Sequence, residues 1–555
     1  MVEQTGQIKP MKPRRLPLRM PDPWSLGALA IAALVLLPIL SVVWIALTPS
    51  ENIWPHLLAT SLPRYFANTV ILMLAVGLLA AMVGTGAAWL VVMYRFPGHR
   101  VLQWALLLPL AIPAYIGAYA LVDFLEYAGP VQTGLRALFG WRSAQDYPFP
   151  EIRSRGSAVV VLAAALYPYV YLLARNAFRE QSVGVLEVSR ALGCGPWASF
   201  LRVGLPLARP AIAAGVAIVM METANDFGTV EFFAVQTLTT GIFSVWLEGG
   251  NAGGAAQLAL VILGLVFVLV ALEKTSRARI RFFRTTSRQA PIQPRRLRGP
   301  GAWLAFALCV IPFAGGFLLP AAVIGANALG NAARWAEPGL WTALTTTVWV
   351  AGAAAVLTVL GGVFLVYGVR LSGHRLPRLV LPATTIGYAA PGAVLGIGLL
   401  IPLAGLDQRL ADGVLALTGY DPGLILTGSA FAIILAYFVR FFAIAQGAAD
   451  AAMGRISPSL PMAARALGQT PFGVLRRVHL PMIRGSVATA LLLVFVDSTK
   501  ELPATLLLRP FNFNTLATRV YEQASLENLG EAAPAAIIVM AVGLAAVLLL
   551  ARASR

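Results

Sequence analysis

Two pairs of carboxylates stand in apolar surroundings in this sequence, one in each half of the chain. Glu222 and Asp226 lie four positions apart, and Asp497 and Glu501 repeat that spacing in the second half. Side chains at i and i+4 project from the same face of a helix. Ionisable groups within an apolar helix usually face a cavity or a partner charge, and carboxylate oxygens are hard ligands that suit a hard cation. The four carboxylates are therefore candidates for lining a cation path.

A purely structural role is the alternative for these residues. The apolar run around Glu222 can end early and leave Asp226 in water, and Lys500 can neutralise Asp497 or Glu501 within the same turn. We assign no metal ligands firmly on this evidence.

Other chemistry is not indicated by the sequence. A phosphate-binding Walker loop needs Gly-Lys followed by Ser or Thr, but none of the four lysines follows a glycine: Lys9, Lys12, Lys274 and Lys500. No zinc-binding HExxH pattern and no credible Ser-His-Asp set is present, and the two cysteines cannot form a disulfide framework. We expect a protein that is not an enzyme and binds no cofactor itself, so that any ATP and Mg²⁺ belong to a partner subunit.

The elements that position the carboxylates are apolar helices. The chain is 58% hydrophobic and 12% charged, whereas soluble domains are about 25% charged. Runs of about 20 apolar residues, enough to cross a bilayer as a helix, recur along its whole length. The expected fold is an all-α polytopic membrane protein whose membrane spans fall at 24–47, 66–93, 101–125, 157–178, 208–226, 256–273, 302–325, 342–369, 376–404, 424–444, 484–500 and 532–551.

Charge placement gives the expected orientation. The net charge is +18, and most Lys and Arg residues fall between alternate spans. This placement is typical of cytoplasmic loops next to the lipid bilayer, so we expect the basic residues to face the membrane surface and not to bind nucleic acid. We expect both termini to be cytoplasmic, and the chain divides at its polar segments. We expect a basic N-terminal segment (1–23), a first half (24–273), a cytoplasmic linker (274–300) and a second half (301–555).

The two halves repeat each other. The same constant offset that places Glu222 on Asp497 places RFPGHR (95–100) on RLSGHR (370–375) and, without gaps from 193 to 246, Trp246 on Tyr521. Because each half has six spans, both copies have the same orientation in the membrane, which makes this a parallel repeat.

The repeat also contains a polar stretch in each half. Ten of the twenty residues at 190–209 are identical to those at 465–484, and glycine and proline divide each stretch into a short helix, a turn, a second short helix and the next span. A single copy would suit an amphipathic helix lying on acidic lipid. Two copies at the same topological position favour a pair of shaped protrusions gripped by a two-fold symmetric partner.

The first stretch resembles the EAA loop of permeases of ATP-binding-cassette importers. It keeps the spacing Glu-x5-Gly-x9-Val-x-Leu-Pro, while Val188 and Ser189 replace two alanines and Met462 replaces the glutamate in the second copy. In that family the loop is a coupling helix that docks on the nucleotide-binding subunit. The resemblance implies coupling loops at about 180–208 and 449–483, whose coupling residues would be Glu187, Arg190, Gly193, Val203, Leu205, Pro206, Ala463, Ala464, Arg465, Gly468, Val478, Leu480 and Pro481.

Other segments are similar to the fused, two-half ferric-iron permeases, as in KELPATLLLRPFNFNTLATRVYEQAS (500–525) and YPYVYLLARNAF (167–178). This resemblance implies a type I importer permease fold in a bacterial inner membrane. It also implies ferric iron as cargo, two copies of an ABC ATPase subunit inside and a substrate-binding protein outside. Arg509 is a candidate contact for that binding protein. The alternatives are an ABC permease for another small solute, such as thiamine or a phosphonate, and a gradient-driven secondary transporter.

Overall fold

The structure is a computed structural model that describes residues 23–181, 183–278, 294–371, 375–385, 387 and 390–553. It is almost entirely helical. The helices of the first half are α1 (Pro23–Leu47), α2 (Trp54–Ala59), α3 (Leu62–Met93), α4 (His99–Ala105), α5 (Ala114–Leu125), α6 (Pro130–Phe139), α7 (Arg155–Arg179), α8 (Val183–Ala191), α9 (Pro196–Ser199), α10 (Leu205–Asn225), α11 (Gly228–Phe232), α12 (Leu238–Phe243) and α13 (Ala252–Ala278).

The second half repeats this order of helices. Its members are α14 (Pro300–Phe313), α15 (Leu319–Gly330), α16 (Pro338–Leu371), α17 (Arg375–Val380), α19 (Gly392–Thr418), α20 (Phe431–Gly454), α21 (Ser459–Ala466), α22 (Pro471–Val474), α23 (Leu480–Thr499), α24 (Pro503–Leu508), α25 (Leu516–Ser525) and α26 (Leu529–Ala553). Two short strands, β1 (Tyr94–Arg95) and β2 (Arg295–Arg296), pair in parallel and attach the end of the linker to the RFPGHR turn.

Eleven helical segments of the described chain are long and apolar enough to cross a membrane, and a twelfth follows if a bent pair counts as one span. The expected fold class is therefore confirmed. The bent pair, His99–Ala111 with Ala114–Phe139, turns by 95° where a continuous span was expected at 101–125. Pro109 and Pro113 lie at this bend, and proline removes a backbone donor and disfavours helix in the residue before it.

The fifth and eleventh spans begin earlier than expected. Helix runs from Pro196 to Asn225 and from Pro471 to Thr499, so that the second short helix of each polar stretch continues into its span. A π-helical turn joins them in both copies, at Phe200–Gly204 and at Leu475–His479. A proline follows each turn, and because its ring clashes with the carbonyl four residues earlier, widening to a π-turn lets the helix continue.

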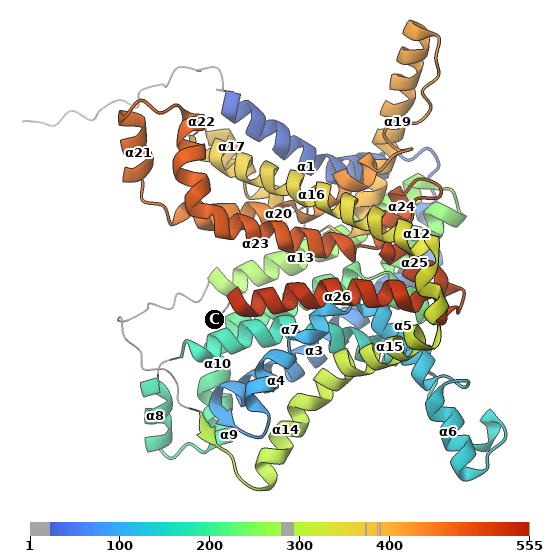
Figure 1. The fold of residues 1–555 in the computed structure, drawn as a ribbon, viewed down its shortest axis with the longest axis vertical. Coiled ribbons are helices and arrows are strands. Elements are labelled where there is room, and N and C mark those ends of the chain that lie inside the picture. The colour runs from blue at the N-terminus through green and yellow to red at the C-terminus, as the bar shows by residue number, and fades with distance from the viewer. Residues whose placement is uncertain are drawn as a thin grey trace, which may run out of the picture.

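The halves of the sequence exchange their first spans in space. Helices α3, α7 and α10 pack together, and α16, α20 and α23 pack together in the same way. Helix α1, however, packs on α16 and α19 of the second half as well as on α13 of its own, and α15 packs on α5 of the first half as well as on α26 of its own (Figure 1). Ala28, Ala32 and Val35 of α1 are accordingly buried in the core of the second half.

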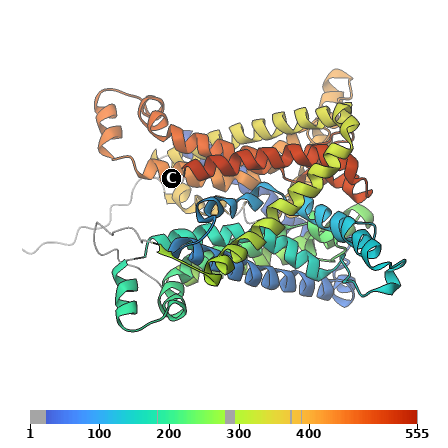
Figure 2. The ribbon, with the colours of Figure 1, turned by 60° about the horizontal axis from the view of Figure 1, so that its bottom comes forward.

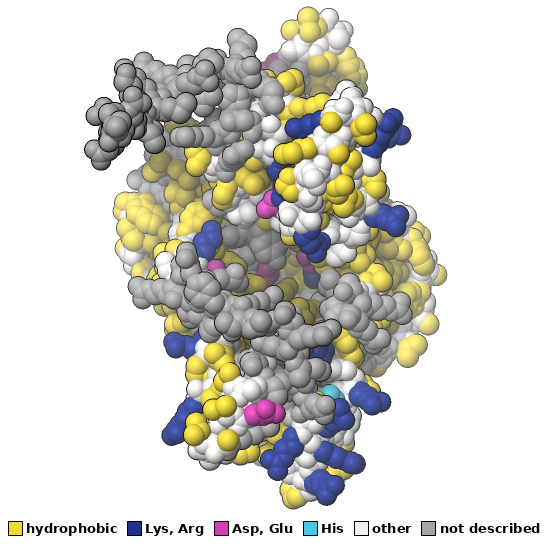
Figure 3. All heavy atoms as spheres, turned by 90° about the vertical axis from the view of Figure 1, so that its left-hand side faces the viewer, with side chains coloured by type: hydrophobic (Ala, Val, Ile, Leu, Met, Phe, Trp, Pro, Cys, Tyr) yellow, Lys and Arg dark blue, Asp and Glu magenta, His cyan; other side chains and the backbone are white. Residues whose placement is uncertain are grey.

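The two polar stretches project from the same end of the helix bundle. Figures 1 and 2 show α8 with α9 and α21 with α22 on opposite sides of that end, at the left of both views. Viewed from this end, Lys and Arg side chains lie among apolar ones on the described surface (Figure 3). Helix α6 and the C-terminal part of α19 project at the other end (Figure 1).

Candidate functional site

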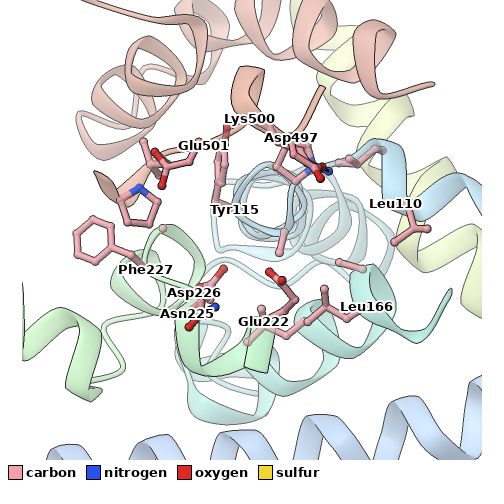
Figure 4. A pocket seen from close by; sticks show the side chains of 18 of the residues that line it. Leu110, Tyr115, Leu166, Glu222, Asn225, Asp226, Phe227, Asp497, Lys500 and Glu501 are labelled. Atoms are coloured by element: carbon pink, nitrogen blue, oxygen red, sulfur yellow. Dashed lines mark ion pairs between the residues drawn. The ribbon is translucent and has the colours of Figure 1, made fainter. Parts of the chain in front are cut away.

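A pocket of about 170 Å³ lies where the two halves meet, and all four predicted carboxylates line it. Glu222 and Asp226 come from the end of α10 and the residue after it, and Asp497 and Glu501 come from the same places at α23 (Figure 4). The two acidic pairs, which belong to different halves of the sequence, are thus brought together around one cavity.

The walls of this pocket are related by the repeat. The offset between the halves relates five further pairs of lining residues: Asn225 with Lys500, Ala165 with Arg440, Leu166 with Phe441, Phe227 with Leu502, and Gly228 with Pro503. Two of these pairs exchange a neutral residue for a basic one. The pocket is therefore symmetric in position and asymmetric in charge, since both of its cations come from the second half.

Asp226 and Glu501 each cap the N-terminus of a short helix, and these two helices are equivalent in the repeat. Asp226 Oδ1 accepts hydrogen bonds from the backbone N–H groups of Thr229 (3.0 Å) and Val230 (3.1 Å) of α11. Glu501 accepts equivalent bonds from Ala504 (3.0 Å) and Thr505 (3.1 Å) of α24. Carboxylates at this position satisfy donors that the helix itself leaves unpaired. Both residues therefore have a structural role in addition to lining the pocket.

The second-half carboxylates each have a cation. Arg440 of α20 donates to Glu501 Oε1 at 3.0 Å, and the Glu501 side chain is only 1% exposed. Lys500 Nζ lies 2.9 Å from Asp497 Oδ1, which is the neutralisation that the sequence offered as the alternative. Gly392 of α19 makes room for the first pair, because a Cβ there would lie 2.6 Å from Glu501 Oε1.

The first half offers oxygens without partners. Among the described residues Glu222 has no hydrogen bond or ion pair, and Asn225 Oδ1 and Tyr115 Oη are buried without a hydrogen-bond partner. Asn225 and Tyr115 are each 5% exposed and line the pocket. Within the described chain, no three His, Cys, Asp or Glu side chains are grouped closely enough to hold a metal ion.

Sequence reasoning missed Arg440, Asn225 and Tyr115. A signal for Arg440 was available, because it is a lone charge within the apolar run LAYFVRFFAIA (435–445) and such charges usually have a partner. Asn225 and Tyr115 gave no signal, since one residue of each type in an apolar helix is common and only the packing shows that their oxygens face a cavity.

The polar stretches form matching helical hairpins. Gly193 and Gly468 have φ angles of +81° and +82°. Beside them, Cys194 N donates to Ser189 O (3.0 Å) and Gln469 N donates to Ala464 O (3.1 Å). A left-handed glycine with such a bond ends a helix in a Schellman motif. The same turn is thus built twice, at equivalent positions of the repeat.

Each hairpin presents apolar side chains to its surroundings at equivalent positions. Leu192 and Leu467 are 78% and 82% exposed, and Trp197 and Phe472 are 71% and 61% exposed. Contiguous exposed apolar patches mark sites of interaction with proteins or membranes. Glu187 and its counterpart Met462 both lie on this exposed surface.

The remaining predicted coupling residues spread over the hairpins and the spans that follow them. Ala463, Arg465 and Pro206 are exposed, and Ala464, Val203, Leu205 and Val478 are half-buried. Leu480 and Pro481 open α23. The side chain of Arg190 lies outside the part of the chain that the structure describes.

Arg509 lies on a connection at the opposite end of the bundle. It bonds to Asn514, and its Nη2 lies 2.5 Å from Glu522 Oε1, with 22% of the side chain exposed. Because Arg509 is held by Asn514 of its own connection and Glu522 of α25, its guanidinium is only partly available to a partner.

The same connection is where the repeat slips. Thr237 and Thr515 cap α12 and α25 in the same way. The offset that relates Glu222 to Asp497 would instead place Thr237 on Asn512, three positions before Thr515. The expected gapless match of Trp246 with Tyr521 is therefore wrong, and the second half has three additional residues here.

Three relatives show what this chain is similar to. The Fe(3+)-transport system permease protein FbpB 2 of Haemophilus influenzae is 26% identical over 491 residues, which cover 85% of this chain and 87% of the relative. The putative ferric transport system permease protein FbpB 1 of the same organism is 23% identical, over 75% of this chain and 64% of the relative. The sulfate transport system permease protein CysT of Escherichia coli is 24% identical, over 44% of this chain and 88% of the relative.

Residues 74–282 match the family model described as "Binding-protein-dependent transport system inner membrane component". These residues contain α7, α10, the first hairpin and the first-half wall of the pocket. The first half of the chain is thus similar to binding-protein-dependent transport system inner membrane components, and 85% of the chain aligns with a transport permease.

Proposed function

We propose that this chain is the membrane permease of an ATP-driven importer for ferric iron, and that the pocket between its halves is a station on the translocation path. The observation that carries the proposal is the pocket itself: four carboxylates against two basic side chains, drawn from equivalent positions of the two halves. A path between pseudo-symmetric halves can open to either side as they rock against each other.

The charge of the pocket favours a cation over an oxyanion. Arg440 and Lys500 are each paired with a carboxylate, so neither is available to bind an anion such as the sulfate named for one relative. Glu222 and Asp226 have no cation partner among the described residues. Carboxylate oxygens suit a hard cation, and two of the relatives described above are named for ferric transport.

ATP hydrolysis is proposed to occur in a separate subunit. The two hairpins, each with the same left-handed glycine and the same exposed Leu and aromatic side chains, would dock on two copies of an ATPase subunit at the cytoplasmic side. This orientation places both termini in the cytoplasm, in agreement with the distribution of basic residues. A substrate-binding protein would then deliver cargo at the other end, where α6 and α19 project.

Uptake by proteoliposomes tests this proposal. Vesicles that contain the chain, its ATPase subunit and its binding protein should accumulate ⁵⁵Fe³⁺ when ATP is supplied to the ATPase side. Vesicles with a hydrolysis-deficient ATPase should not. Uptake of ³⁵S-sulfate or another solute instead of iron would reject ferric iron as the cargo but would still support an ATP-driven importer. Uptake that continues without any ATPase would reject the importer in favour of a gradient-driven carrier.

A further inference from the structure

The two walls of the pocket differ in what they leave unsatisfied. On the second-half wall each carboxylate is paired, Asp497 with Lys500 at 2.9 Å and Glu501 with Arg440 at 3.0 Å. On the first-half wall the Glu222 carboxylate points toward the space between the halves, opposite Asp497 and Lys500 (Figure 4). No described residue pairs with Glu222.

A neutral oxygen on the same wall points to a ligand. Asn225 Oδ1 lines the pocket, is buried and has no hydrogen-bond partner among the described residues. Leaving a buried polar atom unsatisfied costs about 1–3 kcal/mol. Asn225 Oδ1 offers lone pairs, as the Glu222 carboxylate does, so the group that satisfies both is one that accepts electron pairs from oxygen.

We propose that Glu222 and Asn225 Oδ1 form a binding station for a hard polyvalent cation, while the second-half wall neutralises itself. This inference rests on the proposed import of a cation and assigns the binding to one half of the chain. A single carboxylate with one neutral oxygen leaves most ligand positions of the ion to water. Such a site suits a cargo that must leave again better than it suits a resident metal.

The repeat supplies the reason for the asymmetry. Asn225 and Lys500 occupy equivalent positions, each three positions after a carboxylate, Glu222 or Asp497. Lys500 forms an ion pair with the Asp497 carboxylate, whereas the neutral Asn225 cannot form one with Glu222 and leaves the Glu222 carboxylate unpaired. One position in the repeat thus determines which wall can take a cation.

The test is a titration of the full-length chain in nanodiscs with Tb³⁺, a luminescent hard trivalent ion that aromatic side chains sensitise. Wild type should bind Tb³⁺ and release it on addition of Fe³⁺. Glu222→Gln should weaken binding at least tenfold, in the range of about 10–100-fold seen for altered metal-site groups. Glu151→Gln, an exposed carboxylate on the loop before α7, is the matched control and should leave the affinity unchanged.

Exchange of the two equivalent residues gives the sharper result. Asn225→Lys should pair Glu222 as Lys500 pairs Asp497 and abolish the station. Lys500→Asn should free Asp497 and strengthen Tb³⁺ binding, a gain that a misfolded protein cannot show. The double exchange should restore binding to the level of wild type within a few-fold.

Equal Tb³⁺ affinity in wild type, Glu222→Gln and Asn225→Lys would overturn the station. If the wild-type vesicles still import iron in that case, the proposed function survives and only the assignment of the binding wall fails. Absence of ATP-dependent iron uptake by wild type would instead reject the proposed function itself.

Discussion

Arg440 and Glu501 form an ion pair with N–O distance 3.0 Å in the centre of the molecule, and Glu501 at the same time caps α24. The pair therefore connects α20, the end of α23 and α24 at one point. Gly392 allows α19 to approach the same point closely.

Breaking this pair from one side should destabilise the protein strongly. Arg440→Met leaves a buried carboxylate without its cation, which typically costs about 3–5 kcal/mol. Glu501→Gln leaves a buried guanidinium and should cost a similar amount. The thermal unfolding midpoint in detergent should fall for both single variants and recover in part in the double variant Arg440→Met, Glu501→Gln. Additive losses in the double variant would show that the two residues act independently.

The glycines of the hairpins should be more sensitive to substitution than the glutamate of the first one. Gly193→Val and Gly468→Val force a β-branched residue into a left-handed conformation, which costs at least about 1–2 kcal/mol. We expect both to reduce ATP-dependent uptake and co-purification of the ATPase, and we expect Glu187→Met to be milder because Met462 already stands at the equivalent position.

Gly195→Ala provides the matched control for these substitutions. Gly195 has φ −64°, and a Cβ there would meet nothing within 4 Å, so alanine should be tolerated. Equal losses for Gly193→Val, Gly468→Val and Glu187→Met would contradict the idea that backbone shape dominates docking.

Glu527 has a strained backbone conformation and forms an ion pair that connects the two halves. Its φ is +60°, and its carboxylate lies 2.8 Å from Arg153 Nη2 of the first half, which also pairs with Glu126. These hydrogen bonds raise the pKa of the Arg153 guanidinium, Glu126 contributing most. Glu527→Gln should lose up to about 1 kcal/mol, the value of an exposed ion pair.

Glu527→Gly removes the same charge and also the strain, since glycine adopts positive φ without cost. Its thermal unfolding midpoint should therefore exceed that of Glu527→Gln. The opposite order would show that the positive φ carries no strain at this position.

Asp407 ties the projecting part of α19 to the chain that returns from it. Its fully buried carboxylate accepts hydrogen bonds from the backbone N–H groups of Ile425 (2.7 Å), Leu426 (3.0 Å) and Thr427 (2.8 Å). Asp407→Ala leaves these donors unsatisfied, at about 1–3 kcal/mol each when buried. Limited proteolysis should cut the segment 419–424 faster in this variant, and at the wild-type rate in the exposed control Asp412→Asn.

Much of this architecture could be predicted from the sequence because lipid imposes a simple rule. A span must be apolar and helical, so the runs around Val35 and Ile262 can be recognised from hydropathy alone. The internal repeat also shows that Glu222 and Asp497 are equivalent positions before any contact is known. The same reasoning found the hairpins, because glycine and proline spacing determines local backbone shape.

The rest depended on packing between distant elements. Arg440 and Glu501 lie 61 residues apart in sequence, and only the fold brings them together. Three additional residues near Arg509 change the offset between the two halves from that point on. The few identical residues there were too scattered to reveal this insertion. The bend at Pro113 was not predicted, because the hydropathy of the whole run 101–125 is that of one continuous span.

The exchange of first spans has a consequence for how the protein can be divided. In space, α1 covers part of the second half and α15 covers part of the first, although each also contacts its own half. A chain cut within residues 279–293, between α13 and α14, should give two fragments that remain interlocked. Expressed alone, neither fragment has its covering helix, so two genes could replace one only if both products were made together.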